Sequence, residues 1–267
     1  MGEMTFDSFY WAAYGTQDAH LDEVRARLAS GTVGVDGFLE LLQSDSVVAV
    51  GVALDHYRYE QSLTRFGGPH PYEEYESTVL EVARRVLTMP PYPPRDAGDA
   101  EGGDVGLNHA SALRVLGDLG DSSDASVISA VLRADNSPEV FGAALWAAGA
   151  ALLDSDDVDP PDAQLVDVIA EVIFDESRRM KDRVDALLAF NHVQNADVGE
   201  ILARVARLPH KELEVEALAL LIGYYLDAHR STVEEVIGSW SSHDVDGIRK
   251  QILLAFEAAK NRRGEDV

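Results

Sequence analysis

Residues 135–145 read Asp-Asn-Ser-Pro-Glu-Val-Phe-Gly-Ala-Ala-Leu, and this stretch decides the fold. Turn-forming residues come first, and the proline that follows is tolerated at the start of a helix because it needs no backbone donor there. Small apolar residues at Ala143, Ala144 and Ala147 then allow a neighbouring helix to approach closely. The stretch therefore predicts a turn that leads into a helix packed tightly against others.

Similar pairs of helices follow along the chain. Leu165, Val168, Ile169, Val172 and Ile173 recur at helical spacing on one face. Four first helices are expected at 124–134, 163–174, 198–208 and 232–240, the last with Ser231 or Thr232 as its N-cap. Four second helices are expected to begin near residues 137, 182, 212 and 247, and an earlier helix from Leu107 to Gly117 fits the pattern less well.

These hairpins resemble HEAT repeats. The turn Asp135-Asn136-Ser137-Pro138-Glu139-Val140 and the step Ile248-Arg249 match the family pattern, whereas Val184 and Val215 lack the following arginine. The resemblance covers roughly residues 107–263. It implies an all-α fold, an α-solenoid of stacked antiparallel helical hairpins, in which each hairpin buries its apolar stripe against its neighbours. It also implies a concave binding surface but no particular activity.

The N-terminal part is predicted to be helical as well. Asp36 is a candidate N-cap for a helix over 37–43, and further helices are expected over 47–66 and 72–88. The Pro-, Gly- and Asp-rich segment 89–106 is predicted to be a loop. It either separates residues 1–88 from repeats over 107–267 or lies inside one continuous solenoid, and we favour the second because both sides have the same helical character.

The composition restricts the classes of function. The chain has 47 acidic and 22 basic residues, a formal net charge of −25 and no cysteine. Such a charge repels nucleic acids and anionic membranes and favours a basic protein partner. We predict a cytoplasmic protein, because residues 1–7 lack the features of a signal peptide and no long apolar run could span a membrane. Alternatively, the acidity is an adaptation to salt or follows from a GC-rich genome, since the chain contains only four lysines.

Two groups of residues are candidates for partner binding. Acidic residues gather in two runs, and aromatic residues lie beside polar ones on the second helices. Either group also has an ordinary structural interpretation, as solvated loops or as core and seam residues. The candidates are Asp118, Asp121, Asp124, Asp154, Asp156, Asp157, Trp146, His192, Tyr224 and Tyr225.

We therefore predict a non-enzymatic, protein-binding scaffold that needs no cofactor, and in a narrower form an inhibitor or immunity-type protein for a basic partner. The alternative is an enzyme or metal-dependent protein with a site in the concave groove, for which His109, Asp118, Asp121 and His192 are the residues to inspect. His56 and Glu60, at i and i+4, form half of a metal site without a partner motif. No histidine precedes a glutamate, which argues against the iron hydroxylases built from HEAT repeats, and the acidity argues against HEAT-like DNA glycosylases.

Overall fold

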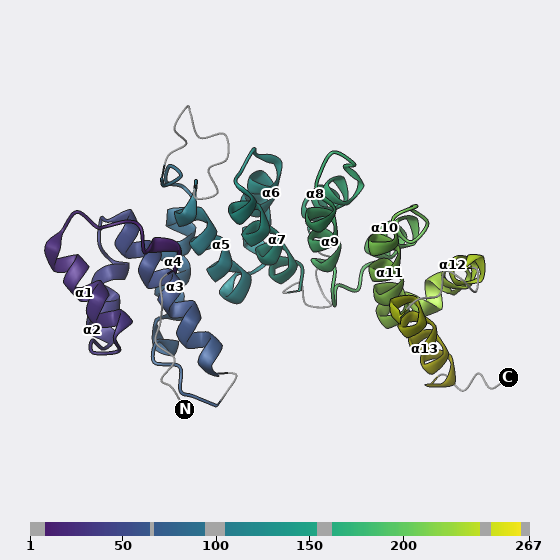
Figure 1. The fold of residues 1–267 in the computed structure, drawn as a ribbon, viewed down its shortest axis with the longest axis horizontal. Helices are drawn as coiled ribbons and strands as arrows, with labels where there is room; N and C mark the ends of the chain where they lie inside the picture. The colour runs from purple at the N-terminus through teal and green to yellow at the C-terminus, as the bar shows by residue number, and fades with distance from the viewer. Residues whose placement is uncertain (1–8, 65–66, 94–104, 154–161, 241–246, 263–267) are drawn as a thin grey trace. The chain divides into compact units, whose positions relative to one another are not determined.

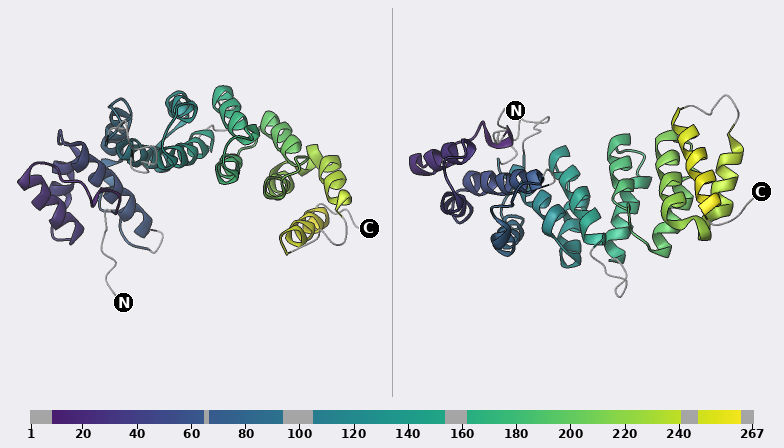
Figure 2. Two further views of the ribbon diagram at one scale, coloured as in Figure 1. Left: turned by 45° about the horizontal axis from the view of Figure 1, so that its top comes forward. Right: turned by 90° about the horizontal axis from the view of Figure 1, so that it is seen from below.

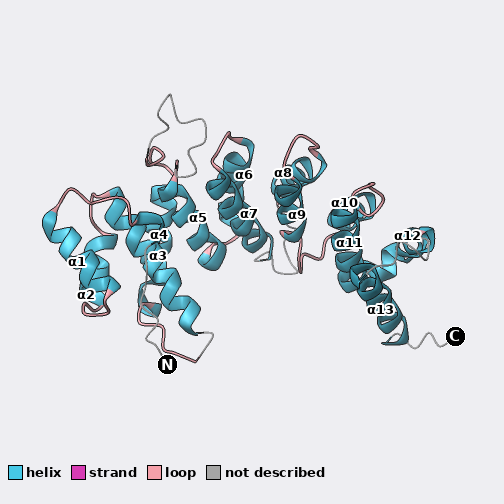
Figure 3. Cartoon of the chain, viewed as in Figure 1, coloured by secondary structure: helices cyan, strands magenta, loops and turns pink. Residues whose placement is uncertain are grey.

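The computed structural model describes residues 9–64, 67–93, 105–153, 162–240 and 247–262 (Figure 1). All regular structure in these ranges is helical, with no strand among them (Figure 3). The helices form two compact units, residues 1–151 and residues 152–267. The predicted all-α architecture is therefore present in both parts of the chain.

The first unit is built around helices that converge on α5. α2 packs against both α1 and α3, and α3 and α4 both pack against α5, so the helices on either side of residues 89–106 lie together. The predicted division of the chain at that segment stays a prediction. Its elements are η1 (Phe9–Trp11), α1 (Ala19–Ala29), α2 (Val35–Leu42), α3 (Val47–Thr64), η2 (Glu73–Tyr75), α4 (Glu76–Val86), α5 (Leu107–Leu119), η3 (Ser122–Asp124), α6 (Ala125–Arg133) and α7 (Pro138–Leu153).

The core of the first unit includes a tryptophan that contacts both α3 and α5. Trp11 is fully buried, and its indole N–H donates to the Ser111 hydroxyl on α5 over 3.2 Å. Gly51 on α3 makes room for the ring, because a Cβ at this position would lie 2.1 Å from a carbon of the indole. The glycine thus lets η1 close over α3, which brings the N-terminal segment into the core.

The second unit is a stack of helical hairpins in two layers. First helices α8, α10 and α12 contact one another in succession, and second helices α9, α11 and α13 do the same (Figure 2). α8 pairs with α9 and α10 pairs with α11, while α12 and α13 both contact η4, and the neighbours within each layer extend the stack. The bounds are α8 (Ala163–Phe174), α9 (Met180–Leu188), α10 (Ala196–Val205), α11 (Lys211–Leu220), the π-helical turn η4 (Leu221–Tyr225), α12 (Leu226–Ser239) and α13 (Gly247–Arg262).

Several boundaries follow from capping residues in the sequence. α8 occupies the predicted range 163–174, and the Asp162 carboxylate accepts from the Leu165 N–H over 2.8 Å at its start. Asn195 caps α10 in the same way, through the N–H groups of Asp197 and Val198. Buried Arg183 donates to the Ile173 carbonyl over 2.8 Å, which places a cation at the C-terminal end of α8. Side chains thus satisfy the backbone groups that helix ends leave open.

Three predicted helices differ from the structure, either in the residue at which they begin or because they are divided. α2 begins at Val35 after Gly34, so Asp36 lies in the first turn, where a carboxylate is also favoured by the helix dipole. The helix predicted over 72–88 divides into η2 and α4, which together cover 73–86. α12 begins at Leu226 rather than at Ser231 or Thr232, because η4 continues α11 directly into it and Thr232 is buried inside the helix.

None of the described helices combines the length and the apolar character needed to cross a membrane.

Candidate functional site

Asp118 connects two helices of the first unit. Its carboxylate on α5 accepts from Arg58 Nε on α3 over 2.5 Å, and the aspartate side chain is almost fully covered. Because the arginine already satisfies this carboxylate, Asp118 stabilises the contact between α3 and α5. Its predicted part in partner binding stays a prediction, and the structure gives the residue an internal partner.

Asp121 and Asp124 share one arginine of α4. Arg84 donates from Nε and Nη2 to the two carboxylate oxygens of Asp124 over 2.8 and 2.9 Å, and from Nη2 to Asp121 over 3.0 Å. Asp124 is buried and also accepts from the Asp121 N–H. Hydrogen bonds from Ser123 lower the pKa of Asp121, with Arg84 adding to the effect, and the bonds to Asp124 raise the pKa of Arg84. Both carboxylates therefore hold η3 against α4.

The remaining acidic candidates belong to the second acidic run. Asp154, Asp156 and Asp157 are outside the described residues.

The predicted aromatic patch is divided between the two units. Trp146, on α7 of the first unit, is half-exposed and lies over Gly117 of α5. Tyr225, in the second unit, is buried, where its hydroxyl donates to the Val193 carbonyl and accepts from the Asn195 N–H. Tyr225 thus holds the loop before α10 in place, as the structural interpretation of the tyrosines expects.

His192 and Tyr224 do come together. The Tyr224 hydroxyl lies 2.7 Å from His192 Nδ1 and donates to Asn191 Oδ1 over 3.1 Å. His192 adopts a positive φ of 68° at the turn after α9, a conformation that most side chains avoid. The exposed side chains of Asn191 and His192 therefore form a small polar cluster with Tyr224 between successive hairpins.

The inspected enzyme residues each have a separate partner. His109 Nε2 lies 2.8 Å from the Met89 carbonyl, Asp118 and Asp121 pair with Arg58 and Arg84, and His192 contacts Tyr224. Across the part of the chain that the structure describes, no three or more His, Asp or Glu side chains are grouped in a way that could hold a metal ion. The predicted convergence of these side chains on one catalytic or metal site is not found.

A groove crosses the three second helices of the second unit, and the sequence analysis missed it. It has a volume of about 490 Å³ and passes over α9, α11 and α13. Ile248, which lines the groove, is 42% exposed, and two further leucines on the outer two of these helices, Leu188 and Leu254, are 44% and 62% exposed. The groove is lined by Met180, Lys181, Val184, Lys211, Glu212, Val215, Glu216 and Ile248.

Two lysines, Lys181 and Lys211, and two glutamates, Glu212 and Glu216, line this groove, and both lysines have interactions of their own. Lys181 forms an ion pair with Asp185 one turn along α9. Glu212 and Glu216 take part in no ion pair with any residue that the structure describes. At neutral pH the middle of the groove thus presents two carboxylates beside exposed apolar side chains.

A largely covered ion pair joins two of the helices that form the groove, α11 and α13. Glu214 Oε1 accepts from Arg249 Nη2 over 2.9 Å and from the Trp240 indole N–H over 3.0 Å, and the Arg249 guanidinium lies over the Trp240 ring. Arg249 belongs to the predicted HEAT step Ile248-Arg249. The arginine therefore joins α13 to α11 while the preceding Ile248 faces the groove.

A sequence signal for the groove does exist. Leu187, Leu188 and Ala189 are consecutive apolar residues, and successive residues on a helix point about 100° apart, so not all of them can face the same core. Leu187 and Ala189 are buried, and Leu188 is exposed.

Comparison with solved structures agrees with this arrangement of helices. A designed armadillo repeat protein in complex with the peptide (KR)4 aligns with 83% of this chain and 98% of its own, at 17% identity and a TM-score of 0.50. The fold is that of HEAT/armadillo-type helical repeats. The predicted α-solenoid of stacked hairpins is thereby confirmed. Computationally designed armadillo repeat proteins for modular peptide recognition align over the same fractions at 16% identity and a TM-score of 0.47.

No protein-family model matches the chain, and no curated protein matches it. In HEAT/armadillo-type repeats each hairpin adds a helix to each of two layers, so the groove over α9, α11 and α13 is built by the repeat itself.

Proposed function

We propose that the protein is a binding scaffold whose second unit holds an extended segment of a basic partner protein along α9, α11 and α13. The observation that carries this proposal is the groove, in which apolar residues of α9, α11 and α13, among them the exposed Ile248, lie beside two carboxylates without an ion-pair partner among the described residues. Stacked helical repeats present such extended surfaces to their ligands.

The spacing of the helices indicates the pattern of the partner segment. Packed helices lie about 8–10 Å apart, and an extended chain advances about 3.3 Å per residue. A segment that crosses α9, α11 and α13 would therefore place an apolar side chain over the groove at about every third residue. Half-buried Val184 on α9 and exposed Ile248 on α13 offer apolar contacts, whereas Val215 on α11 lines the groove but is buried.

The charge favours basic residues between those apolar ones. Lysine or arginine would pair with Glu212 and Glu216, while Lys181 is already paired within α9. The net charge of −25 would also speed the approach of a basic partner. The designed armadillo protein that shares the fold was solved with the peptide (KR)4, which is a ligand of the same charge.

The test uses fluorescent peptides of defined pattern. We expect a peptide that repeats Leu-Lys-Lys to bind, with a dissociation constant that rises with salt, and its Leu-Glu-Glu counterpart to bind at least about tenfold more weakly. The double variant Glu212→Lys/Glu216→Lys should lose about tenfold in affinity for the basic peptide. Glu200→Lys, an exposed change on first helix α10, is the matched control and should bind normally.

Equal binding of the two peptides, or equal effects of the groove variant and the control, would overturn the proposal. Ile248→Ser tests the apolar contact separately, since this exposed residue can change without opening a cavity. The narrower hypothesis, that the partner is a basic toxin or nuclease that binding neutralises, stays a prediction from the sequence.

A further inference from the structure

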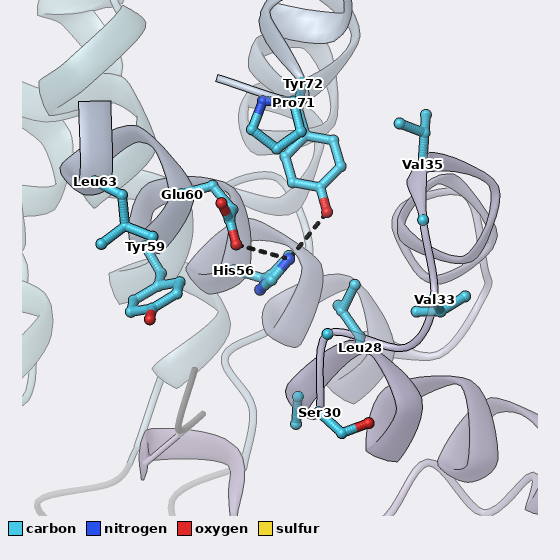
Figure 4. Close-up of a pocket in the computed structure, with 13 residues that line it drawn as sticks. Leu28, Ser30, Val33, Val35, His56, Tyr59, Glu60, Leu63, Pro71 and Tyr72 are labelled. Carbon is cyan, nitrogen blue, oxygen red and sulfur yellow. Dashed lines mark hydrogen bonds and ion pairs between the residues drawn. The ribbon is translucent and has the colours of Figure 1, made fainter. Parts of the chain in front are cut away.

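A pocket in the first unit has a lining that combines apolar and polar side chains. It lies where the end of α1 and the loop before α2 meet α3, and it has a volume of about 470 Å³, within the range of small-molecule sites (Figure 4). Its apolar walls come from these separate elements and from the segment after α3. They include Leu28, Val33, Val35, Leu63 and Pro71.

Among the described residues that line this cavity, Glu60 is the only carboxylate, and none is a lysine or an arginine. Its side chain is mostly covered, and no lysine or arginine of the described residues pairs with it. Burial raises the pKa of Glu60, and the charge of His70 opposes that rise. A cation that enters beside this carboxylate would stabilise its negative charge, because the surrounding protein supplies little positive charge of its own.

His56 does not supply the missing charge. Its Nε2 atom lies 3.8 Å from Glu60 Oε1 and 2.9 Å from the Tyr72 hydroxyl, and Figure 4 shows both side chains directed towards it. Burial lowers the pKa of His56 to about 4, so the imidazole is neutral at pH 7. The cavity is therefore negative when Glu60 is ionised, although a histidine stands beside the carboxylate.

Aromatic rings complete the surroundings of the carboxylate. The His56 ring lies 6.3 Å from the Tyr59 ring and 5.6 Å from the Tyr72 ring, measured between centroids. Faces of tyrosine rings attract cations through their quadrupole, an effect that adds to the charge of the carboxylate. Tyr59 and Glu60 are neighbours on α3 and both line the cavity.

We propose that this cavity binds a small organic ammonium ion, with the ammonium group beside Glu60 and Tyr59 and an aliphatic body against Leu28, Val33 and Val35. The single carboxylate and the uncharged imidazole fit a monovalent cation, whereas an anion would meet repulsion. The apolar walls require a ligand with a hydrocarbon part, which distinguishes it from a hydrated metal ion. This site lies in the first unit and is independent of the peptide groove in the second.

The experiment measures binding of hexylammonium, n-hexanol and hexanoate to the full-length protein by calorimetry at pH 7.5. The three probes have the same chain and differ in the charge of the head group. We expect hexylammonium to bind at least about tenfold more tightly than hexanol, and hexanoate not to bind, because only the ammonium can form an ionic hydrogen bond with Glu60.

Two variants locate the site. Glu60→Gln should reduce the hexylammonium affinity to that of hexanol, whereas Glu81→Gln, an exposed change on α4 of the same unit, should leave it unchanged. Tyr59→Leu keeps the carboxylate and removes the ring, and it should weaken binding several-fold. Circular dichroism confirms that each variant is folded before its affinity is compared.

A separate arm measures N-acetyl-lysine N′-methylamide. Binding as tight as that of hexylammonium would show that a lysine side chain of another protein fills the cavity and would overturn the assignment to a small molecule. Equal affinities for hexylammonium and hexanol, no binding at millimolar concentration, or a normal affinity in folded Glu60→Gln would overturn the ammonium site itself.

Discussion

Acidic residues of this chain act in two different ways, and their neighbours decide which. Asp118, Asp121 and Asp124 lie within reach of arginines on α3 and α4, so their charges are used inside the fold. Glu212 and Glu216 have no such partner among the described residues, so their charges face the groove. The same residue type therefore contributes to stability at one place and to a binding surface at another.

The Arg84 cluster yields a prediction at this scale. Asp124→Asn should lower the free energy of unfolding by about 1–3 kcal/mol, because Asp124 is buried and loses two charged hydrogen bonds. Asp121→Asn should cost less than about 1 kcal/mol, because that side chain is 42% exposed and asparagine can still cap η3. Urea unfolding at neutral pH compares them, and equal losses would contradict the assigned roles.

At the scale of elements, glycines inside helices mark close contacts. A Cβ at Gly117 of α5 would lie 1.8 Å from Trp146 Cδ1 on α7. The same atom at Gly142, also on α7, would meet nothing within 4 Å. Helix propensity alone would favour alanine at both positions, by about 1 kcal/mol each. The structure distinguishes the two positions, because an indole packs against the helix at Gly117 and none of the described residues packs against Gly142.

Substitution of these glycines tests that contact. Gly142→Ala should raise the free energy of unfolding by about 0.5–1 kcal/mol, because it restricts the unfolded chain and strengthens the helix. Gly117→Ala should lower it by about 1–2 kcal/mol, because the base of the Trp146 ring must move. Thermal unfolding and tryptophan fluorescence measure both effects. A gain in stability for Gly117→Ala would show that the packing of Trp146 against α5 does not require glycine at this position.

Element boundaries also depend on neighbours. Helix α8 matches its prediction because Asp162 caps it locally, and a capping side chain is visible in the sequence. The predicted start of α12 was wrong because η4 joins α11 to α12 without a capping residue, and the kink at His229 lies inside α12. Thr232, the expected cap, instead accepts from Arg207 on the loop after α10. Such a continuation rests on tertiary packing, which no local signal reports.

The whole molecule carries a net charge of −25, and this charge should make its stability depend on salt. We expect the melting temperature to rise by about 3 °C or more between about 0.1 and 2 M sodium chloride, because screening reduces repulsion among carboxylates. Most of the rise should be complete by about 1 M, where the screening length is about 3 Å.

Differential scanning calorimetry makes the measurement, with sucrose at matched osmolality as the control for general exclusion effects. A melting temperature that does not change with salt would remove salt adaptation as the reason for the acidity. The basic partner and genome composition would then be the remaining explanations for the charge.

The sequence by itself determined the helical class, the hairpin repeat and most helices of residues 107–262, because helical spacing, caps and turn residues are local signals. It also determined the net charge. Only the tertiary structure decided which carboxylates meet arginines, which apolar residues of the second helices face a groove, and that His56 and Glu60 border a cavity. These features join residues far apart in the chain, so they depend on how helices pack and not on the order of residues within any one helix.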